Sequence, residues 1–137
     1  MNIEDLSSQI GMPCELLIED AGISVIGTPY AYCDGDEFPA FAEVRGNQIR
    51  LFDDGNILIH IRSLGISLDA HGSIAELRAL AEKHGLTLTA EGEFETCANP
   101  DEISSALMRY LRALRDVDDW EQEQLHAREA PLLVTTV

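Results

Sequence analysis

The feature that most constrains this chain is one apolar stripe in its C-terminal third. The stripe residues are separated by steps of four, three, four and three positions: Ile103, Leu107, Tyr110, Leu114 and Val117. This spacing places them on one side of an α-helix, which has about 3.6 residues per turn. Asn99 and Pro100 precede the stripe and are typical of an N-cap and a first helical position. We therefore predict one long helix whose apolar side packs against another layer.

Much of the preceding chain consists of short segments rich in β-branched and aromatic residues. Strands are expected at 14–20 and 23–32. Hairpins are expected at 38–52, turning at 45–47, and at 86–96, turning at Glu91-Gly92, with a looser loop as the alternative for the second. A short helix is expected at 3–10, and the tail at 131–137 is strand-like. A chain of 137 residues with this pattern is predicted to form one α+β domain over 1–137. Its sheet should be mainly antiparallel, with helices packed on one face.

The segment 72–85 has the clearest signals for the ends of a helix. Ser73 and Glu76 have the three-residue spacing of a capping box, in which Ser73 is the N-cap. Gly85 is placed to end the helix. A second amphipathic helix is therefore expected before the last hairpin.

Residues 50–61, RLFDDGNILIHI, place two aspartates and a glycine between two apolar runs. Asp-Gly between such runs is typical of a β-hairpin. The alternative is a strand, a turn and a helix, in which Asp53, Asp54 or Asn56 is the N-cap and Gly65 ends the helix. In both cases Asp53, Asp54 and Gly55 are expected to form a structural turn, because no EF-hand spacing follows them. Periodicity alone leaves both alternatives open.

The formal charge of −16 limits the classes of partner. A surface this acidic disfavours direct binding to nucleic acid or to an anionic membrane. It favours a basic protein surface as the partner. The N-terminus lacks the basic start and apolar core of a secretory signal, and no apolar run is long enough to span a membrane. A cytoplasmic protein is therefore expected.

Acidic residues gather in two short segments. The first surrounds the tryptophan: Asp116, Asp118, Asp119, Trp120, Glu121 and Glu123. The second lies in a predicted loop: Asp34, Asp36 and Glu37. Neighbouring like charges lower helix stability, and tryptophan is a common interface anchor, so the first segment is predicted to bind a partner. The second segment is predicted as a second partner-binding cluster. Charge reversal at Asp118, Asp119 and Glu121 is expected to leave the fold intact.

Motifs of common active sites are absent from the sequence. It contains no GxSxG, GxxxxGK[ST] or GxGxxG, and the cysteines form no CxxC pair. Three histidines lie at irregular separations: His60, His71 and His84. We therefore predict no enzymatic activity, no cofactor and no metal. The alternative is a metal-dependent hydrolase or nuclease that uses Asp53 and Asp54 near His60.

Several segments resemble one family of bacterial and phage domains. They are IRLFDDGN, then LGI, a capped helix ending in HGL, LTAEGEF, and a long helix beginning PDEISSALMRYLRAL and ending DVDDW. Thr28-Pro29 also resembles the N-terminal part of this family, the domain of unknown function 1828. The family's hallmark is a strand followed by an Asp-Asp-Gly turn, and the resemblance covers roughly residues 25–120. It implies a helix at 56–64, which favours the strand–turn–helix alternative, and it supplies no catalytic residue.

The resemblance also implies an origin in prophages and other mobile elements. Together with the charge, this favours a small acidic non-enzymatic protein that binds a basic protein surface. The specific form of this expectation is an inhibitor of a host nucleic-acid-binding defence complex, similar to an anti-CRISPR protein. A further alternative is an oligomeric scaffold, such as a homodimer joined through the C-terminal strand.

Overall fold

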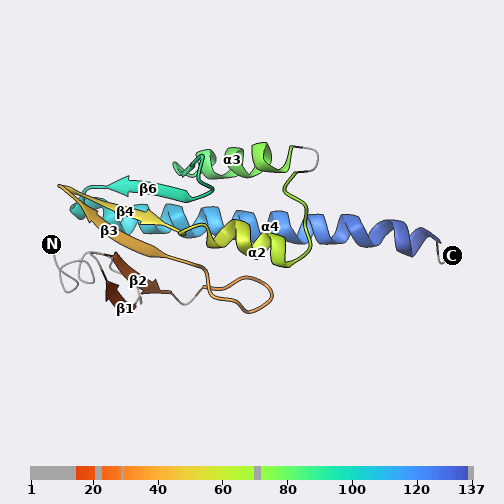
Figure 1. Ribbon diagram of the computed structural model, residues 1–137, viewed down its shortest axis with the longest axis horizontal. Helices are drawn as coiled ribbons and strands as arrows, with labels where there is room; N and C mark the ends of the chain where they lie inside the picture. The colour runs from red at the N-terminus through yellow and green to blue at the C-terminus, as the bar shows by residue number, and fades with distance from the viewer. Residues whose placement is uncertain (1–14, 21–22, 29, 70–71, 136–137) are drawn as a thin grey trace.

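An antiparallel sheet packs against one long helix, α4 (Ile103–Thr135), which extends beyond the other elements (Figure 1). The computed structural model describes residues 15–20, 23–28, 30–69 and 72–135. The strands are β1 (Glu15–Asp20), β2 (Ile23–Gly27), β3 (Phe41–Arg45), β4 (Gln48–Phe52), β5 (Thr87–Leu88) and β6 (Phe94–Ala98). The other helices are α2 (Asn56–Ser63), α3 (Ser73–Lys83) and the short 3-10 turn η1 (Pro100–Glu102). The result is a single α+β domain, as predicted.

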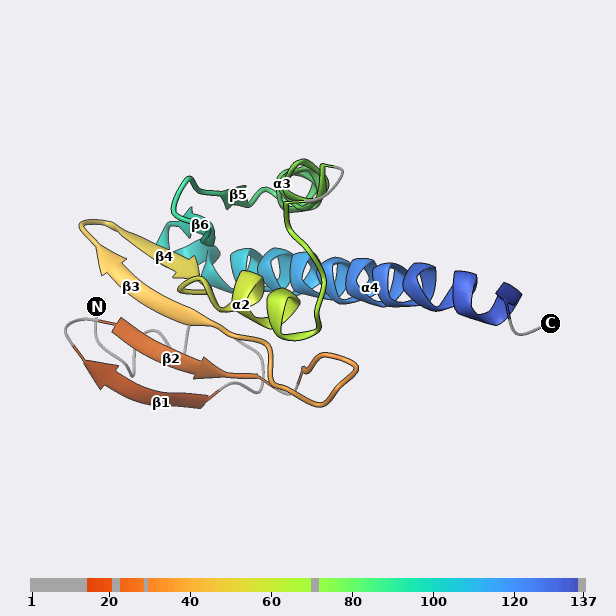
Figure 2. The same cartoon turned by 45° about the vertical axis from the view of Figure 1, so that its right-hand side comes forward.

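The six strands lie in the order β1-β2-β3-β4-β6-β5, and each neighbouring pair is antiparallel. Figure 2 shows β1 and β2 at one edge of this sheet, away from α3. The β3–β4 hairpin closes through Gly46 and Asn47, and Gly46 has the positive φ of 59° that a tight turn requires. The β5–β6 hairpin closes across Glu91 and Gly92. Both predicted hairpins are therefore confirmed.

The core lies between the sheet and the apolar side of α4. All five stripe residues have an exposed fraction of zero, as predicted: Ile103, Leu107, Tyr110, Leu114 and Val117. From the sheet they face Ile49, Leu51 and Phe94, which are also fully or almost fully buried. Burying one such side chain contributes about 1.5–3 kcal/mol. This stripe therefore fixes the position of α4 on the sheet.

The segment after β4 is a turn followed by helix α2, not the second strand of a hairpin. Ile57 and Ile61 are fully buried, whereas Ile59 is 60% exposed. A strand would have placed these three isoleucines on one face. The helical alternative, which the family resemblance favoured, is therefore confirmed.

Three predictions about the helices are wrong. The N-cap position of α2 is Gly55, with a φ of 77°, and not Asp53, Asp54 or Asn56. The N-cap of α3 is Gly72, with a φ of 77°, and Ser73 is the first helical residue. The carboxylate of Glu76 accepts a hydrogen bond from Trp120 Nε1, so it is engaged by α4 and not by the start of its own helix. The tail predicted as a strand at 131–137 continues α4 to Thr135. Pro131 donates no backbone hydrogen bond, but each other residue that extends the existing helix adds one without a new nucleation step, and this opposes local β-propensity.

The helix predicted at 3–10 lies outside the described residues. Within the described part of the chain, no helix is both long and apolar enough to cross a membrane.

Candidate functional site

The loop between β2 and β3 folds back on itself and carries three of the predicted partner-binding residues. Tyr32 N donates to Asp36 O at 2.8 Å, and Gly35 N donates to Tyr32 O at 2.9 Å. Asp34 Oδ1 accepts a hydrogen bond from Asp36 N at 2.9 Å, which is an Asx turn. We call residues 31–38 the 31–38 loop. Its tip is stiffened by these local bonds, and Asp34, Asp36 and Glu37 are all exposed.

Buried aromatic residues hold the 31–38 loop on the core. Tyr32 and Phe38 are both buried, and their rings meet edge to face with centroids 4.8 Å apart. The hydroxyl of Tyr110, on α4, donates to Pro39 O just after the loop. Such aromatic contacts add stabilisation beyond burial alone. These contacts therefore fix the position of the loop's acidic tip relative to the core.

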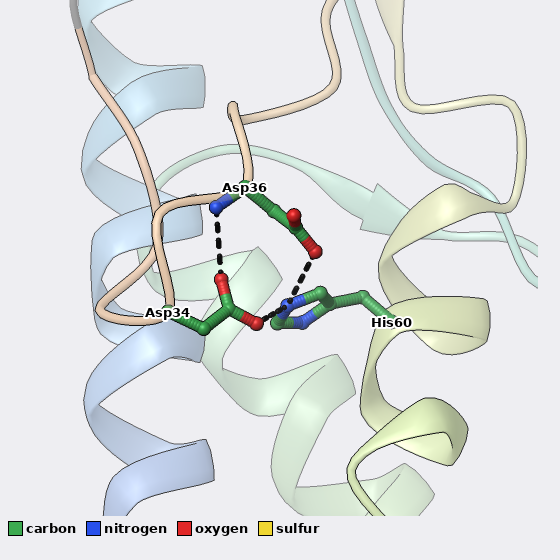
Figure 3. A group of neighbouring side chains, drawn as sticks. All are labelled: Asp34, Asp36 and His60. Carbon is green, nitrogen blue, oxygen red and sulfur yellow. Dashed lines mark hydrogen bonds and ion pairs between the residues drawn. The ribbon is translucent and has the colours of Figure 1, made fainter.

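His60 of α2 is the centre of a polar cluster between the 31–38 loop and α4. Its Nδ1 lies 2.9 Å from Glu121 Oε1, and its Nε2 lies 2.7 Å from Asp34 Oδ2. The Nε2 atom is also 3.7 Å from Asp36 Oδ2 (Figure 3). Tyr32 stacks on the imidazole at a centroid distance of 3.8 Å. We call Asp34, Asp36, His60 and Glu121 the His60 cluster.

The helical position of Glu121 explains why a carboxylate lies inside this cluster. Steps of four and three along α4 lead from Tyr110 to Leu114 and Val117, and the next step of four reaches Glu121. Its side chain is 0% exposed. Burial raises the pKa of this carboxyl to about 7, although the hydrogen bond to His60 opposes the shift. Extending the apolar period by one step would have predicted this burial from the sequence.

The protonation of His60 follows from its two carboxylate neighbours. Burial alone would lower the pKa of the imidazole, but its hydrogen bonds to Glu121 and Asp34 raise the pKa overall. Hydrogen bonds from Asp36 N and from His60 lower the pKa of Asp34. The arrangement therefore favours a charged imidazole beside an ionised Asp34.

Asp118 anchors the loop at a second point on α4. Its carboxylate accepts hydrogen bonds from Cys33 N at 3.2 Å and from Cys33 Sγ at 3.1 Å. Asp118 is only 7% exposed. Asp118 therefore binds the 31–38 loop, whereas Glu121 binds His60 of α2.

The other predicted acidic residues of α4, Asp116, Asp119 and Glu123, lie on the side of the helix that faces α3. Asp116 accepts hydrogen bonds from His84 Nε2 at 2.7 Å and from Lys83 Nζ at 3.4 Å. Trp120 is buried, and Asp119 and Glu123 are exposed beside it. The predicted acidic segment of α4 therefore lies on two sides of the helix. Asp118 and Glu121 face the 31–38 loop and α2, and the other predicted residues face α3. The burial of Asp118 and Glu121 argues against the expectation that charge reversal at Asp118, Asp119 and Glu121 leaves the fold intact.

Asp53, Asp54 and Gly55 form the turn between β4 and α2. Asp53 is fully buried, and its carboxylate accepts hydrogen bonds from Gly55 N at 3.2 Å, Ile57 N at 2.8 Å and Phe94 N at 2.8 Å. Burial raises the pKa of Asp53 to about 6, against these three hydrogen bonds. Asp54 is exposed with a φ of 55°, and Gly55 has a φ of 77°. Asp53 therefore links β4 to α2 and β6. The alternative that placed Asp53 and Asp54 beside His60 differs from the structure, in which the imidazole bonds to Asp34 and Glu121.

A hollow of about 490 Å³ opens beside the 31–38 loop. Its lining consists of Tyr32, Asp36, Glu37, Pro39, Phe41, Asn56, Ile59, His60 and Ser63. These described residues include two exposed carboxylates and several apolar side chains, but no lysine or arginine. The hollow can therefore accept an apolar group that is flanked by positive charge.

Comparison with known proteins places this region in a family. The model of the family described as "Domain of unknown function DUF1828" matches residues 28–117. No curated protein and no solved structure matches the chain. The matched range contains the 31–38 loop, the Asp53 turn and His60, and it ends four residues before Glu121.

Proposed function

The chain belongs to the DUF1828 family, and we propose that it is a non-enzymatic protein that binds a basic protein surface. The observation that carries this proposal is the hollow beside the 31–38 loop, whose lining combines carboxylates with apolar side chains. Interfaces of this kind obtain affinity from buried apolar contacts and orientation from complementary charge at their edge. The proposed binding surface comprises Asp36, Glu37 and Ile59 with the hollow between them.

The exposure of these three residues supports the proposal. The side chain of Asp36 is 72% exposed, and Glu37 is exposed beside it. Ile59 is one of three large hydrophobic residues exposed among the described ones. It protrudes from α2 while its neighbours in that helix are buried. An exposed isoleucine beside fixed carboxylates is suited to contact a partner that has both apolar and basic groups.

The net charge suggests a specific partner class. At −16, the chain repels nucleic acid and attracts surfaces that bind phosphates. The specific form of the proposal is that the chain occupies the basic groove of a cytoplasmic host nucleic-acid-binding complex and inhibits it. Encounter between the two would be accelerated electrostatically and would weaken as salt rises.

The test is a pull-down from bacterial lysate with immobilised full-length chain, followed by mass spectrometry. The test variant is the double substitution Glu37→Lys with Ile59→Lys, which adds three positive charges on the proposed surface. The matched control is Ala75→Lys with Glu82→Lys, which adds the same charge at two exposed positions of α3. Thermal unfolding of each variant verifies that the fold is retained.

We expect the wild type and the control to recover the same partner at low salt, and the test variant to recover at least about tenfold less. Added duplex DNA should displace the partner if its nucleic-acid groove is the surface occupied. Equal recovery by the test variant and the control would refute the proposed surface. A captured partner that DNA does not displace would refute the groove-blocking form.

A further inference from the structure

We propose that Asp34, Asp36 and His60 bind one divalent transition-metal ion, and that Glu121 orients the imidazole from its other side. One ligand atom from each of the three residues lies within 4.8 Å of the other two. In Figure 3 the two aspartates of the loop converge on the imidazole of α2. The inference goes beyond the proposed binding function and does not depend on it.

The distances suit a metal shell after a small movement of the aspartate side chains. Metal–ligand bonds to imidazole nitrogen and carboxylate oxygen are about 2.0–2.2 Å, so neighbouring ligand atoms lie about 3–3.5 Å apart. Here Nε2 is 2.7 Å from Asp34 Oδ2 and 3.7 Å from Asp36 Oδ2. An ion would require the first distance to open by roughly half an ångström and the second to close slightly. Both aspartates are exposed, so rotation of their side chains can make this adjustment while the loop backbone stays in place.

Glu121 supplies the feature that separates this cluster from ordinary surface acids. Histidines that bind metals usually donate their second ring N–H to a carboxylate, which fixes the ring and its tautomer. The fully buried Glu121 holds Nδ1 at 2.9 Å in this way. When Nδ1–H donates a hydrogen bond to Glu121, the neutral imidazole has a lone pair on Nε2 that points at the two aspartates. That lone pair then needs either a second proton or a cation.

The charge balance of the cluster favours a cation that carries more than one positive charge. A second hollow, of about 210 Å³, is lined by Cys33, Asp34, His60, Leu64, Asp118, Glu121, Gln122 and Leu125. These lining residues include three carboxylates and no lysine or arginine. Glu121 Oε2 is buried there and has no hydrogen-bond partner among the described residues. One imidazolium supplies a single positive charge beside these carboxylates, whereas a neutral imidazole with a divalent ion supplies two.

The donor set selects the class of metal. Mg²⁺ and Ca²⁺ prefer shells made entirely of oxygen. One imidazole nitrogen with two carboxylates suits zinc and the neighbouring first-row divalent ions. Water would complete the coordination on the solvent side, where Asp36 is most exposed.

The test uses the full chain after treatment with a chelator, titrated with ZnCl₂ by calorimetry and with CoCl₂ by visible absorption. Asp36→Asn removes one ligand at an exposed position, and Glu37→Gln is the matched control at the next residue. Glu121→Gln tests the orienting carboxylate, with its urea midpoint recorded to verify folding. MgCl₂ is the control ion.

We expect the wild type and Glu37→Gln to bind one Zn²⁺ with equal affinity, and Asp36→Asn to bind at least about tenfold more weakly. Glu121→Gln should lower the affinity by about 10- to 100-fold, as is usual for such supporting carboxylates. Zinc affinity should also fall as pH decreases, since protons compete for Nε2. No saturable uptake of Zn²⁺, or equal affinity in Asp36→Asn and Glu37→Gln, would overturn the site. Binding of Mg²⁺ as tight as Zn²⁺ would overturn the class of metal.

Discussion

Replacing Asp53 with alanine should destabilise the domain by an amount that depends on pH. The substitution removes the acceptor for two buried backbone donors, Ile57 N and Phe94 N, and for Gly55 N. An unsatisfied buried donor costs about 1–3 kcal/mol, so the two buried groups together give about 3 kcal/mol. This estimate applies at pH 5, where the carboxyl of folded Asp53 is mostly protonated.

The pH dependence follows from the raised pKa of Asp53, about 6 in the fold against an ordinary value of 3.8. A carboxyl whose pKa is higher in the folded state contributes its full stability below pH 4 and loses it as pH rises through 6. Between pH 5 and pH 8 the loss amounts to about 1.4 kcal/mol, since one pKa unit corresponds to about 1.36 kcal/mol. Asp53→Ala should therefore cost about half as much at pH 8 as at pH 5.

The assay is urea unfolding followed by circular dichroism at both pH values. For a domain of this size the dependence of the unfolding free energy on urea is about 1–3 kcal/mol per molar. A cost of about 3 kcal/mol should thus lower the midpoint by roughly 1–3 M. The control is Asp54→Gly, at an exposed position with a φ of 55° that glycine adopts freely. A midpoint shift in Asp53→Ala no larger than in the control would refute the bonding role, and a larger cost at pH 8 than at pH 5 would refute the direction of the pKa shift.

Two further predictions concern the turn and the polar cluster. Gly55→Val should lower the melting temperature more than Asp54→Ala, because a β-branched residue resists a φ of 77°; equal small shifts in differential scanning calorimetry would contradict this. Glu121→Lys should unfold or strongly destabilise the domain, since it buries a second positive charge against His60, whereas Glu123→Lys at an exposed position should change stability by less than about 0.5 kcal/mol. Similar urea midpoints for these two lysine variants would show that Glu121 is not buried in solution.

Much of the fold could be predicted because its signals are local. The stripe from Ile103 to Val117 specifies a helix and its buried side within the span of that helix itself. The hairpins are specified by turn residues between alternating apolar runs. The tail after Pro131 was predicted as a strand because local β-propensity does not include the effect of a helix that already precedes it.

The His60 cluster could not be predicted in the same way. His60 is 26 residues from Asp34 and 61 residues from Glu121, so no motif spacing connects them. The clustering of acidic residues in the sequence identified Asp34 and Glu121, but it did not show that Asp34 is exposed and Glu121 is buried. The helical period of α4 distinguishes the buried Glu121 from the exposed Glu123, but it does not identify His60 as the partner of Glu121.

The position of α4 at the end of the described chain has a consequence for biosynthesis. Strand β4 is complete by Phe52, but the stripe that covers it begins at Ile103, about fifty residues later. At translation rates of about 5–20 residues per second, the apolar face of β4 stays uncovered for several seconds before the stripe of α4 has been synthesised. The contact between Cys33 and Asp118 spans 85 residues and forms later still. The hairpins can therefore form on the ribosome. The complete core and the packing of the 31–38 loop against α4 require that α4 has been translated. During that interval, ribosome-associated chaperones can bind the uncovered strands.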